Sequence, residues 1–187
     1  MAKFFGNLNA VLGVGVVLLL LVIFGVQQAF DANYLFRFLH VICGIMWIGH
    51  LYYFNFTQIP TMPKVPAELK PGVSKYIAPV ALFWFRWGAA ATVVTGLIVV
   101  IQAGYAHEAF TLQKPFRTIG IGMWLALIMA FNVWFIIWPA QKKALGLVEA
   151  DADTKAKAAT RAMMFSRTNT LLSIAMLYCM ISAESGI

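Results

Sequence analysis

The sequence predicts an all-α fold: a polytopic membrane helix bundle of about five transmembrane helices, with one N-terminal helix and a four-helix core. The first observation is composition: 61% of the 187 residues are hydrophobic and 11% are charged, whereas soluble domains are about half apolar and about a quarter charged. The second is the length of the apolar runs, since roughly 20 apolar residues cross a hydrocarbon core of about 30 Å. Five stretches qualify: 8–29, 34–57, 78–103, 118–139 and 163–183.

The first stretch begins shortly after Lys3 and resembles the start of a secretory signal. Its apolar run is longer than the usual central region of such a signal, and no A-x-A cleavage site follows it. We therefore expect residues 1–30 to form a retained transmembrane helix. The four later stretches form the core over 34–183, and the whole chain, 1–187, is expected to be a single membrane domain.

Two longer connectors differ in composition. The connector at 58–77 contains four prolines, which predicts an extended or turning surface loop because proline lacks a backbone N–H and disfavours helix interiors. The connector at 140–162 is rich in alanine with mixed charges, which favours a helical extension of the spans into solvent.

The distribution of basic residues predicts the orientation. Nine lie at the N-terminus or in these two connectors, namely Lys3, Lys64, Lys70, Lys75, Lys142, Lys143, Lys155, Lys157 and Arg161, against Arg37, Lys114 and Arg117 on the other side. Cytoplasmic loops carry the excess of Lys and Arg. We therefore expect a multi-pass protein of a bacterial inner membrane, with a cytoplasmic N-terminus and a periplasmic C-terminus.

Several classes of function are excluded. The net charge is +7, but the basic residues form no stripe interleaved with aromatic side chains, so we do not expect nucleic acid as a partner. The expected partner of the basic residues is the lipid bilayer. Cys43 and Cys179 lie in apolar stretches and form no CxxC motif. The absence of CxxCH excludes a covalent c-type haem on this sequence.

Polar side chains recur inside the apolar stretches. Ionisable groups are costly in hydrocarbon and are therefore candidates for function. Counting about 1.5 Å of rise per residue from the centre of each stretch brings residues from four helices to one level. These candidates are His50, Arg86, Asn132 and Asn169, with Trp47 beside them and Arg167 closer to the surface. The alternative role for such groups is to join helices by hydrogen bonds.

His40 and His50 are candidate ligands of haem iron. They are ten residues apart on one stretch, which separates them by about 15 Å in height and about 80° in azimuth, so one haem cannot take both. Two b-type haems at different depths would each take one of them. A non-haem metal, or a histidine that only forms hydrogen bonds, is the alternative.

Arg86 has no acidic residue in any apolar stretch to balance its charge. A haem propionate, an anionic substrate or a partner subunit would supply the missing anion. The alternative is that the long side chain of Arg86 extends to the membrane surface, as arginine side chains in membranes do.

The segments FLHVICGIMWIGHLYYFNFTQIPTMPKVPAELK, FRWGAAATVVTG, FNVWFIIWPAQKK and SRTNTLLSIAMLY together resemble the membrane domain of bacterial membrane-anchored urate hydroxylases, the urate oxidase N-terminal domain family. The resemblance covers about 34–183. The residues that carry it are His40, Trp47, Asn55, Arg86, Asn132, Trp138, Pro139, Arg167 and Asn169. It implies a helical membrane domain that full-length members join to a C-terminal cytochrome c domain, and electron transfer from urate to the respiratory chain. The sequence to Ile187 lacks that domain, so we expect a stand-alone form with a separate cytochrome c as partner.

Together these features predict a redox-linked integral membrane protein that binds haem b through His40 or His50, with Arg86 and Arg167 meeting an anionic group. We expect it to form a homo-oligomer or a subunit of a membrane complex. The sequence assigns no catalytic residue or substrate. Two alternatives remain: a non-catalytic accessory subunit of a respiratory or oxidase complex, and a small transporter of anions or metal ions.

Overall fold

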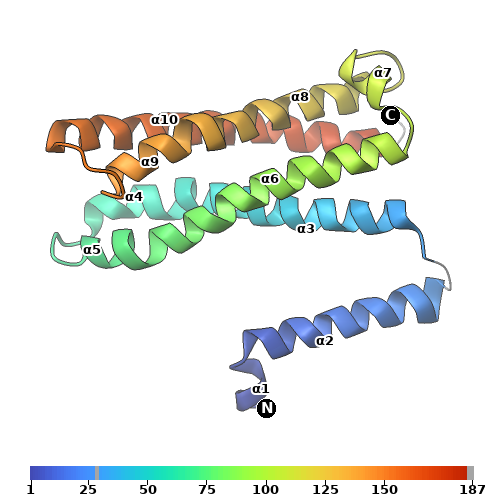
Figure 1. Ribbon diagram of the computed structural model, residues 1–187, viewed down its shortest axis with the longest axis horizontal. Helices are drawn as coiled ribbons and strands as arrows, with labels where there is room; N and C mark the ends of the chain where they lie inside the picture. Colours follow the sequence, from blue (N-terminus) through green and yellow to red (C-terminus); the bar gives the residue numbers. More distant parts are fainter. Residues whose placement is uncertain (28–29, 185–187) are drawn as a thin grey trace. The chain divides into compact units, whose positions relative to one another are not determined.

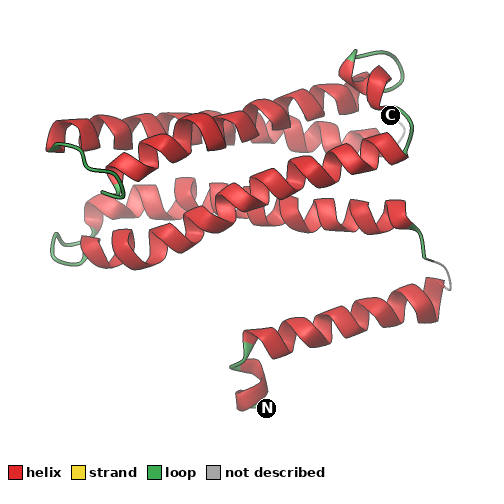
Figure 2. Cartoon of the chain, in the orientation of Figure 1, coloured by secondary structure: helices red, strands yellow, loops and turns green. Residues whose placement is uncertain are grey.

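The computed structural model describes residues 1–27 and 30–184, and every regular element in those ranges is a helix (Figure 2). The all-α prediction is therefore confirmed. The chain divides into two compact units, Met1–Leu35 and Phe36–Ile187, which are treated separately below.

The first unit contains α1 (Ala2–Phe5), α2 (Leu8–Leu21) and the π-helical turn η1 (Val22–Gln27). Asn7 caps α2, because its side-chain oxygen accepts the N–H of Ala10 at 3.2 Å. The helical stretch Leu8–Val26 is long and apolar enough to cross a membrane. The predicted span over 8–29 also includes residues 28–29, which lie outside the described residues.

The second unit is built mainly from four long helical stretches (Figure 1). The first contains α3 (Ala32–Tyr52), η2 (Tyr53–Gln58), α4 (Ile59–Thr61) and the 3₁₀ turn η3 (Met62–Lys64). The second contains α5 (Lys70–Gly72), η4 (Val73–Ile77) and α6 (Ala78–Gln102). The third, preceded by the short α7 (Ala106–Phe110), contains α8 (Arg117–Phe131), η5 (Asn132–Ile137) and α9 (Trp138–Ala144). The fourth is α10 (Ala152–Glu184).

Four helical stretches in the described ranges could span a membrane: Leu8–Val26, Ala32–Lys64, Lys70–Gln102 and Arg117–Ala144. They correspond to four of the five predicted spans, although the predicted spans 8–29 and 78–103 extend past the ends of Leu8–Val26 and Lys70–Gln102. The fifth, 163–183, lies inside α10, which has 33 residues but is not among the four. Arg167, Asn169 and several hydroxyl residues make that stretch more polar than the others.

Prolines explain three wide turns within these long helices. Pro60, Pro79 and Pro139 each occupy the second residue of a helical segment that directly follows a π-helical turn. The ring of a proline clashes with the carbonyl four residues earlier and provides no N–H for it. A wider turn relieves that conflict while the helix continues, and such turns are frequent at functional sites.

The two connectors differ in how well composition predicted them. The predicted extended loop at 58–77 was wrong over most of its length, since helical structure continues to Lys64 and resumes at Lys70. Three of its four prolines, Pro60, Pro63 and Pro71, occupy the first turns of short segments, where a missing N–H is tolerated. The connector at 140–162 is helical as predicted, apart from a break between Ala144 and Ala152.

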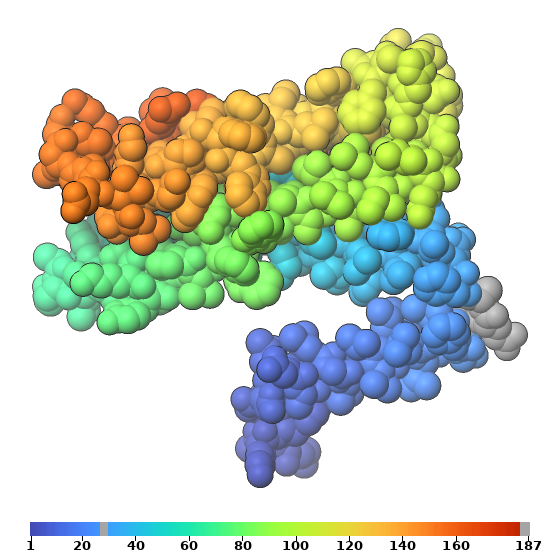
Figure 3. Space-filling view, in the orientation of Figure 1, coloured from blue at the N-terminus to red at the C-terminus, as the bar shows by residue number. Residues whose placement is uncertain are grey.

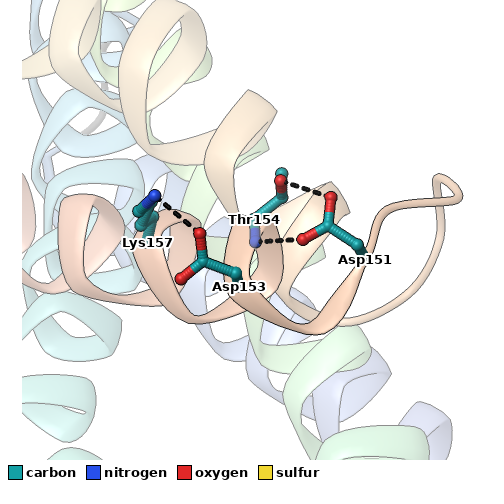
Figure 4. Close-up of polar contacts among 4 residues, drawn as sticks. All are labelled: Asp151, Asp153, Thr154 and Lys157. Atoms are coloured by element: carbon teal, nitrogen blue, oxygen red, sulfur yellow. Dashed lines mark hydrogen bonds and ion pairs between the residues drawn. The ribbon is translucent and has the colours of Figure 1, made fainter.

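The break before α10 is closed by side-chain caps. The carboxylate of Asp151 accepts the backbone N–H of Thr154 at 2.8 Å and its hydroxyl at 2.7 Å, while Lys157 pairs with Asp153 at 2.6 Å on the exposed face (Figure 4). The N–H of Thr154, followed by its hydroxyl, holds the pKa of Asp151 below its usual value. The first turn of α10 is therefore anchored by a negative charge at the positive end of its dipole.

The core of the second unit lies between α3, α6 and the α8–α9 stretch. Its fully buried side chains include Trp47, Leu51, Phe85, Met129, Val133 and Ile137. Side chains of α6 (green) lie against those of the α8–α9 stretch (yellow to orange) on the face shown in Figure 3.

α10 packs against α8, η5 and α9 and presents two opposite faces. Ser166, Asn169 and Ser173 are buried against the bundle, at no more than 5% exposure. Leu171, Ile174, Tyr178 and Ile181 are each about 70% exposed. A helix in water buries its apolar stripe and exposes its polar face, whereas the part of α10 from Asn169 to Ile181 buries polar side chains and exposes large apolar ones.

Candidate functional site

Asn132 and Asn169 form a buried pair that joins η5 to α10. The amide of Asn132 donates to Oδ1 of Asn169 at 2.8 Å, and the amide of Asn169 donates to the carbonyl of Met129 at 2.9 Å. Asn169 is fully buried and Asn132 is 6% exposed. Interhelical amide bonds of this kind position neighbouring helices in membrane bundles.

Two further bonds join α10 to the first long stretch. The amide of Asn55 donates to Oγ of Ser166 at 2.8 Å. Tyr52 and Ser173 are 3.0 Å apart, and because the hydroxyl of Ser173 donates to the carbonyl of Thr170, Tyr52 is the donor in their bond. The name polar seam is used below for these six residues: Tyr52, Asn55, Asn132, Ser166, Asn169 and Ser173.

Only part of the polar seam was predicted from depth counting. Ser166, Ser173 and Tyr52 were not singled out, and Asn55 entered only through the family resemblance. The signal that finds the serines is their spacing: Ser166, Asn169 and Ser173 are three and four residues apart, which places them on one helix face.

His50 faces an apolar groove of about 550 Å³ between the first two long stretches. Its lining residues are Ile45, Met46, Gly49, His50, Tyr53, Tyr76, Ile77, Val80, Ala81 and Trp84. Nδ1 of His50 lies 2.6 Å from the carbonyl of Met46. A carbonyl only accepts, so Nδ1 carries the proton and Nε2 is the nitrogen with a lone pair to offer.

His40 packs tightly against α6 instead. Its Nδ1 lies 2.9 Å from the carbonyl of Thr92 and 3.4 Å from Oγ1 of Thr95. The ring covers Gly96, where an added Cβ would be 2.8 Å from Cε1 of the imidazole. Because Gly96 has no side chain, the ring of His40 can pack directly on the surface of α6.

Arg86 stacks on an aromatic ring and pairs with no carboxylate among the described residues. Its Cζ lies 3.4 Å from the ring centroid of Trp138, and Nζ of Lys142 lies 5.7 Å from the same centroid. Nη1 of Arg86 is buried without a hydrogen-bond partner. Among the described residues, the only salt bridge is the one between Asp153 and Lys157.

Trp47 and Arg167 differ in burial. Trp47 is fully buried where α3 meets α6, and its backbone lies 3.1 Å from a Cβ placed on Gly88. Its indole N–H has no hydrogen-bond partner among the described residues. Arg167 lies on the exposed side of α10, away from the buried residues of the polar seam.

The seven candidates therefore fall into separate places. Asn132 and Asn169 bond to each other, while His50 lines the groove and His40 lies against Gly96. Arg86 does not line the groove: it follows Trp84 by two residues, which turns it about 200° round α6. Within the described residues, no three His, Cys, Asp or Glu side chains form a cluster that could hold a metal ion.

The groove partly matches the requirements of haem b. It offers an apolar surface for a flat ring and one imidazole nitrogen for an axial position. No arginine or lysine lines it to meet propionates. The residues therefore fit one axial ligand and the ring, and the remaining contacts would have to come from another chain.

Residues 97–187 match the family described as Urate oxidase N-terminal. The match starts near the end of α6 and includes Asn132, Arg167 and Asn169, whereas His40, His50, Trp47 and Arg86 precede it. Comparisons with curated proteins and with solved structures gave no significant match.

Proposed function

We propose, on the premise that residues 97–187 belong to the Urate oxidase N-terminal family, that the chain is a redox-linked integral membrane protein that holds haem b on His50. The observation that carries the proposal is the geometry of His50. Its Nδ1 is tied to the carbonyl of Met46, which leaves Nε2 for a ligand in an apolar groove. A backbone carbonyl on the second nitrogen is the arrangement that orients metal-binding histidines.

The membrane assignment rests on five helices. Four stretches have the length and composition of spans. α10 is added as the fifth because its apolar face is exposed and its polar face is buried. With five spans, the distribution of basic residues favours a cytoplasmic N-terminus and a periplasmic C-terminus in a bacterial inner membrane.

Haem bound there would supply one-electron transfer. His50 would hold the iron, and Tyr53, Tyr76 and Trp84 would cover the ring. The second axial ligand and the cations for the propionates would come from a second copy or from another subunit. His40 is the weaker candidate, because its ring is packed on Gly96.

The test is an optical spectrum with metal analysis of the full chain purified from a haem-replete host. We expect a Soret band that is lost in His50→Ala. His107→Ala is the matched control, since His107 is exposed in a short helix outside the groove, and it should keep the band. A band that survives His50→Ala, or a purified protein without haem or iron, would overturn the assignment.

An accessory subunit is the second candidate, and the polar seam favours it. Its six side chains bond to one another or to nearby backbone, so they stabilise the bundle without any ligand. Purification in mild detergent tests this role: stable co-purification with respiratory subunits and no haem supports it, and a haem-containing homo-oligomer excludes it.

A further inference from the structure

We propose that Arg86, Trp138 and Lys142 form a binding site for the phosphate group of an anionic phospholipid. The site lies between α6 and α9, on a different side of α6 from the groove of His50. It does not rest on the haem proposal, and either can fail without the other.

Two cationic side chains lie against one tryptophan ring. The guanidinium of Arg86 and the ammonium of Lys142 both lie over Trp138, at 3.4 and 5.7 Å from its centroid. Both positive charges therefore lie against one ring, and neither α6 nor α9 contains a carboxylate to balance them. The arrangement is therefore incomplete without a negative charge.

That negative charge needs a source. Neither Lys70–Gln102 nor Arg117–Ala144 contains an aspartate or a glutamate. A buried or half-buried arginine needs an anion and hydrogen-bond acceptors. One of its N–H groups, at Nη1, is already buried without a partner. The anion must then come from outside these two stretches.

The level of the site in the bundle indicates which anion supplies it. Trp138 and Lys142 are one helical turn apart near the end of the candidate span Arg117–Ala144. Tryptophan and lysine gather at this position in membrane helices because it coincides with the lipid headgroups. Arginine binds phosphate oxygens in a bidentate manner, and lysine adds a point charge. A headgroup phosphate is thus the anion that matches both the chemistry and the depth.

The experiment uses the full chain in neutral detergent, with native mass spectrometry to count bound lipid and measure affinity. Phosphatidylglycerol is compared with phosphatidylcholine of the same acyl chains. We expect one phosphatidylglycerol to bind at least tenfold more tightly than phosphatidylcholine. Arg86→Gln should weaken it about tenfold, the loss expected for a charge-assisted hydrogen bond.

A matched pair of lysines keeps the test valid if Arg86→Gln does not fold. Lys142 lies over Trp138, whereas its neighbour Lys143 is exposed and makes no such contact. Lys142→Gln should weaken binding of phosphatidylglycerol several-fold, and Lys143→Gln should leave it unchanged. Equal effects of the two substitutions would show a general surface charge and overturn the proposal.

Inorganic phosphate distinguishes the source of the group. We expect no displacement of phosphatidylglycerol by millimolar inorganic phosphate, because the acyl chains anchor the lipid beside the site. Displacement that also depends on Arg86 would overturn the lipid assignment in favour of a soluble anion. Equal binding of both phospholipids to the wild type would remove the site altogether.

Discussion

Replacing Asn169 by alanine tests whether the polar seam holds α10 against the bundle. Asn169 accepts a bond from Asn132 and donates one to the carbonyl of Met129, so the substitution removes two buried interhelical bonds. Bonds between membrane helices contribute about 0.6 kcal/mol on average and up to about 1.7 kcal/mol. We therefore expect a loss of about 1–3 kcal/mol in the free energy of unfolding.

The double-mutant cycle with Asn132→Ala isolates the bond between the two side chains. Asn132→Ala alone removes one of the two bonds and should cost about 0.6–1.7 kcal/mol beyond the small cavity that it leaves. The double variant should be less destabilised than the sum of the single variants, with a coupling energy of similar size. Reversible unfolding by sodium dodecyl sulfate from mixed micelles, followed by helical circular dichroism, gives the four free energies.

Thr168→Ala is the control on the same helix. Thr168 is exposed, and its hydroxyl bonds only to the carbonyl of Met164 in its own turn, so its free energy of unfolding should change by less than about 0.5 kcal/mol. Additive single substitutions, with a coupling below about 0.3 kcal/mol, would refute the pairing of Asn132 with Asn169. So would an effect of Thr168→Ala as large as that of Asn169→Ala.

Three further predictions concern packing, capping and the seam. Gly120→Ala should destabilise the chain by about 3 kcal/mol or more in the same unfolding assay, because the added Cβ would lie 2.0 Å from the carbonyl oxygen of Ala109. Gly49→Ala is the control: its Cβ would have no atom within 4 Å, so its free energy of unfolding should not change. Because the pKa of Asp151 is lowered, its capping contribution is present at neutral pH and is lost as pH falls below the usual range of an aspartate and through that lowered pKa. The protection of the amides in the first turn of α10 against hydrogen exchange, measured relative to the intrinsic exchange rate at each pH, should therefore fall on acidification in the wild type but not in Asp151→Asn. Equal pH profiles of protection in the two proteins would contradict the assigned cap. Ser166→Ala should lower the yield of folded protein less than Asn169→Ala, since it breaks one interhelical bond instead of two, and a reversed order in detergent-solubilised yield would count against this ranking.

Much of the fold follows from the sequence because hydrocarbon allows few solutions for a chain with this composition. Backbone groups in lipid must be bonded internally, so long apolar runs become helices. The start of α2 can also be predicted from the sequence, since Asn7 is a typical cap residue at the boundary. The ends of the other long stretches were harder to place, because Pro60 and Pro71 continue helical structure where proline was expected to stop it.

The rise per residue predicted a common level for Asn132 and Asn169, but it did not predict the directions of the other candidate side chains. Asn132 and Asn169 were placed at one level from rise alone, and they are bonded to each other. His50 and Arg86 were placed at one level by the same count, yet they face different sides of α6. The rise per residue determines height, whereas the partner of a side chain depends on its azimuth and on which helix lies there.

The π-helical turns are a physical reason why azimuth cannot be counted uniformly along these helices. Each turn adds about one residue to the helical repeat, so side chains after it are rotated relative to a regular helix. η2 and η5 lie before Pro60 and Pro139, and they carry Asn55 and Asn132 of the polar seam. A proline can be located in the sequence, but whether a π-helical turn forms before it depends on packing against neighbouring helices. If Pro139→Ala converts the wide turn to a regular helix, the residues around it rotate. We therefore expect this substitution to move Trp138 relative to Arg86, and the amide of Asn132 relative to Asn169.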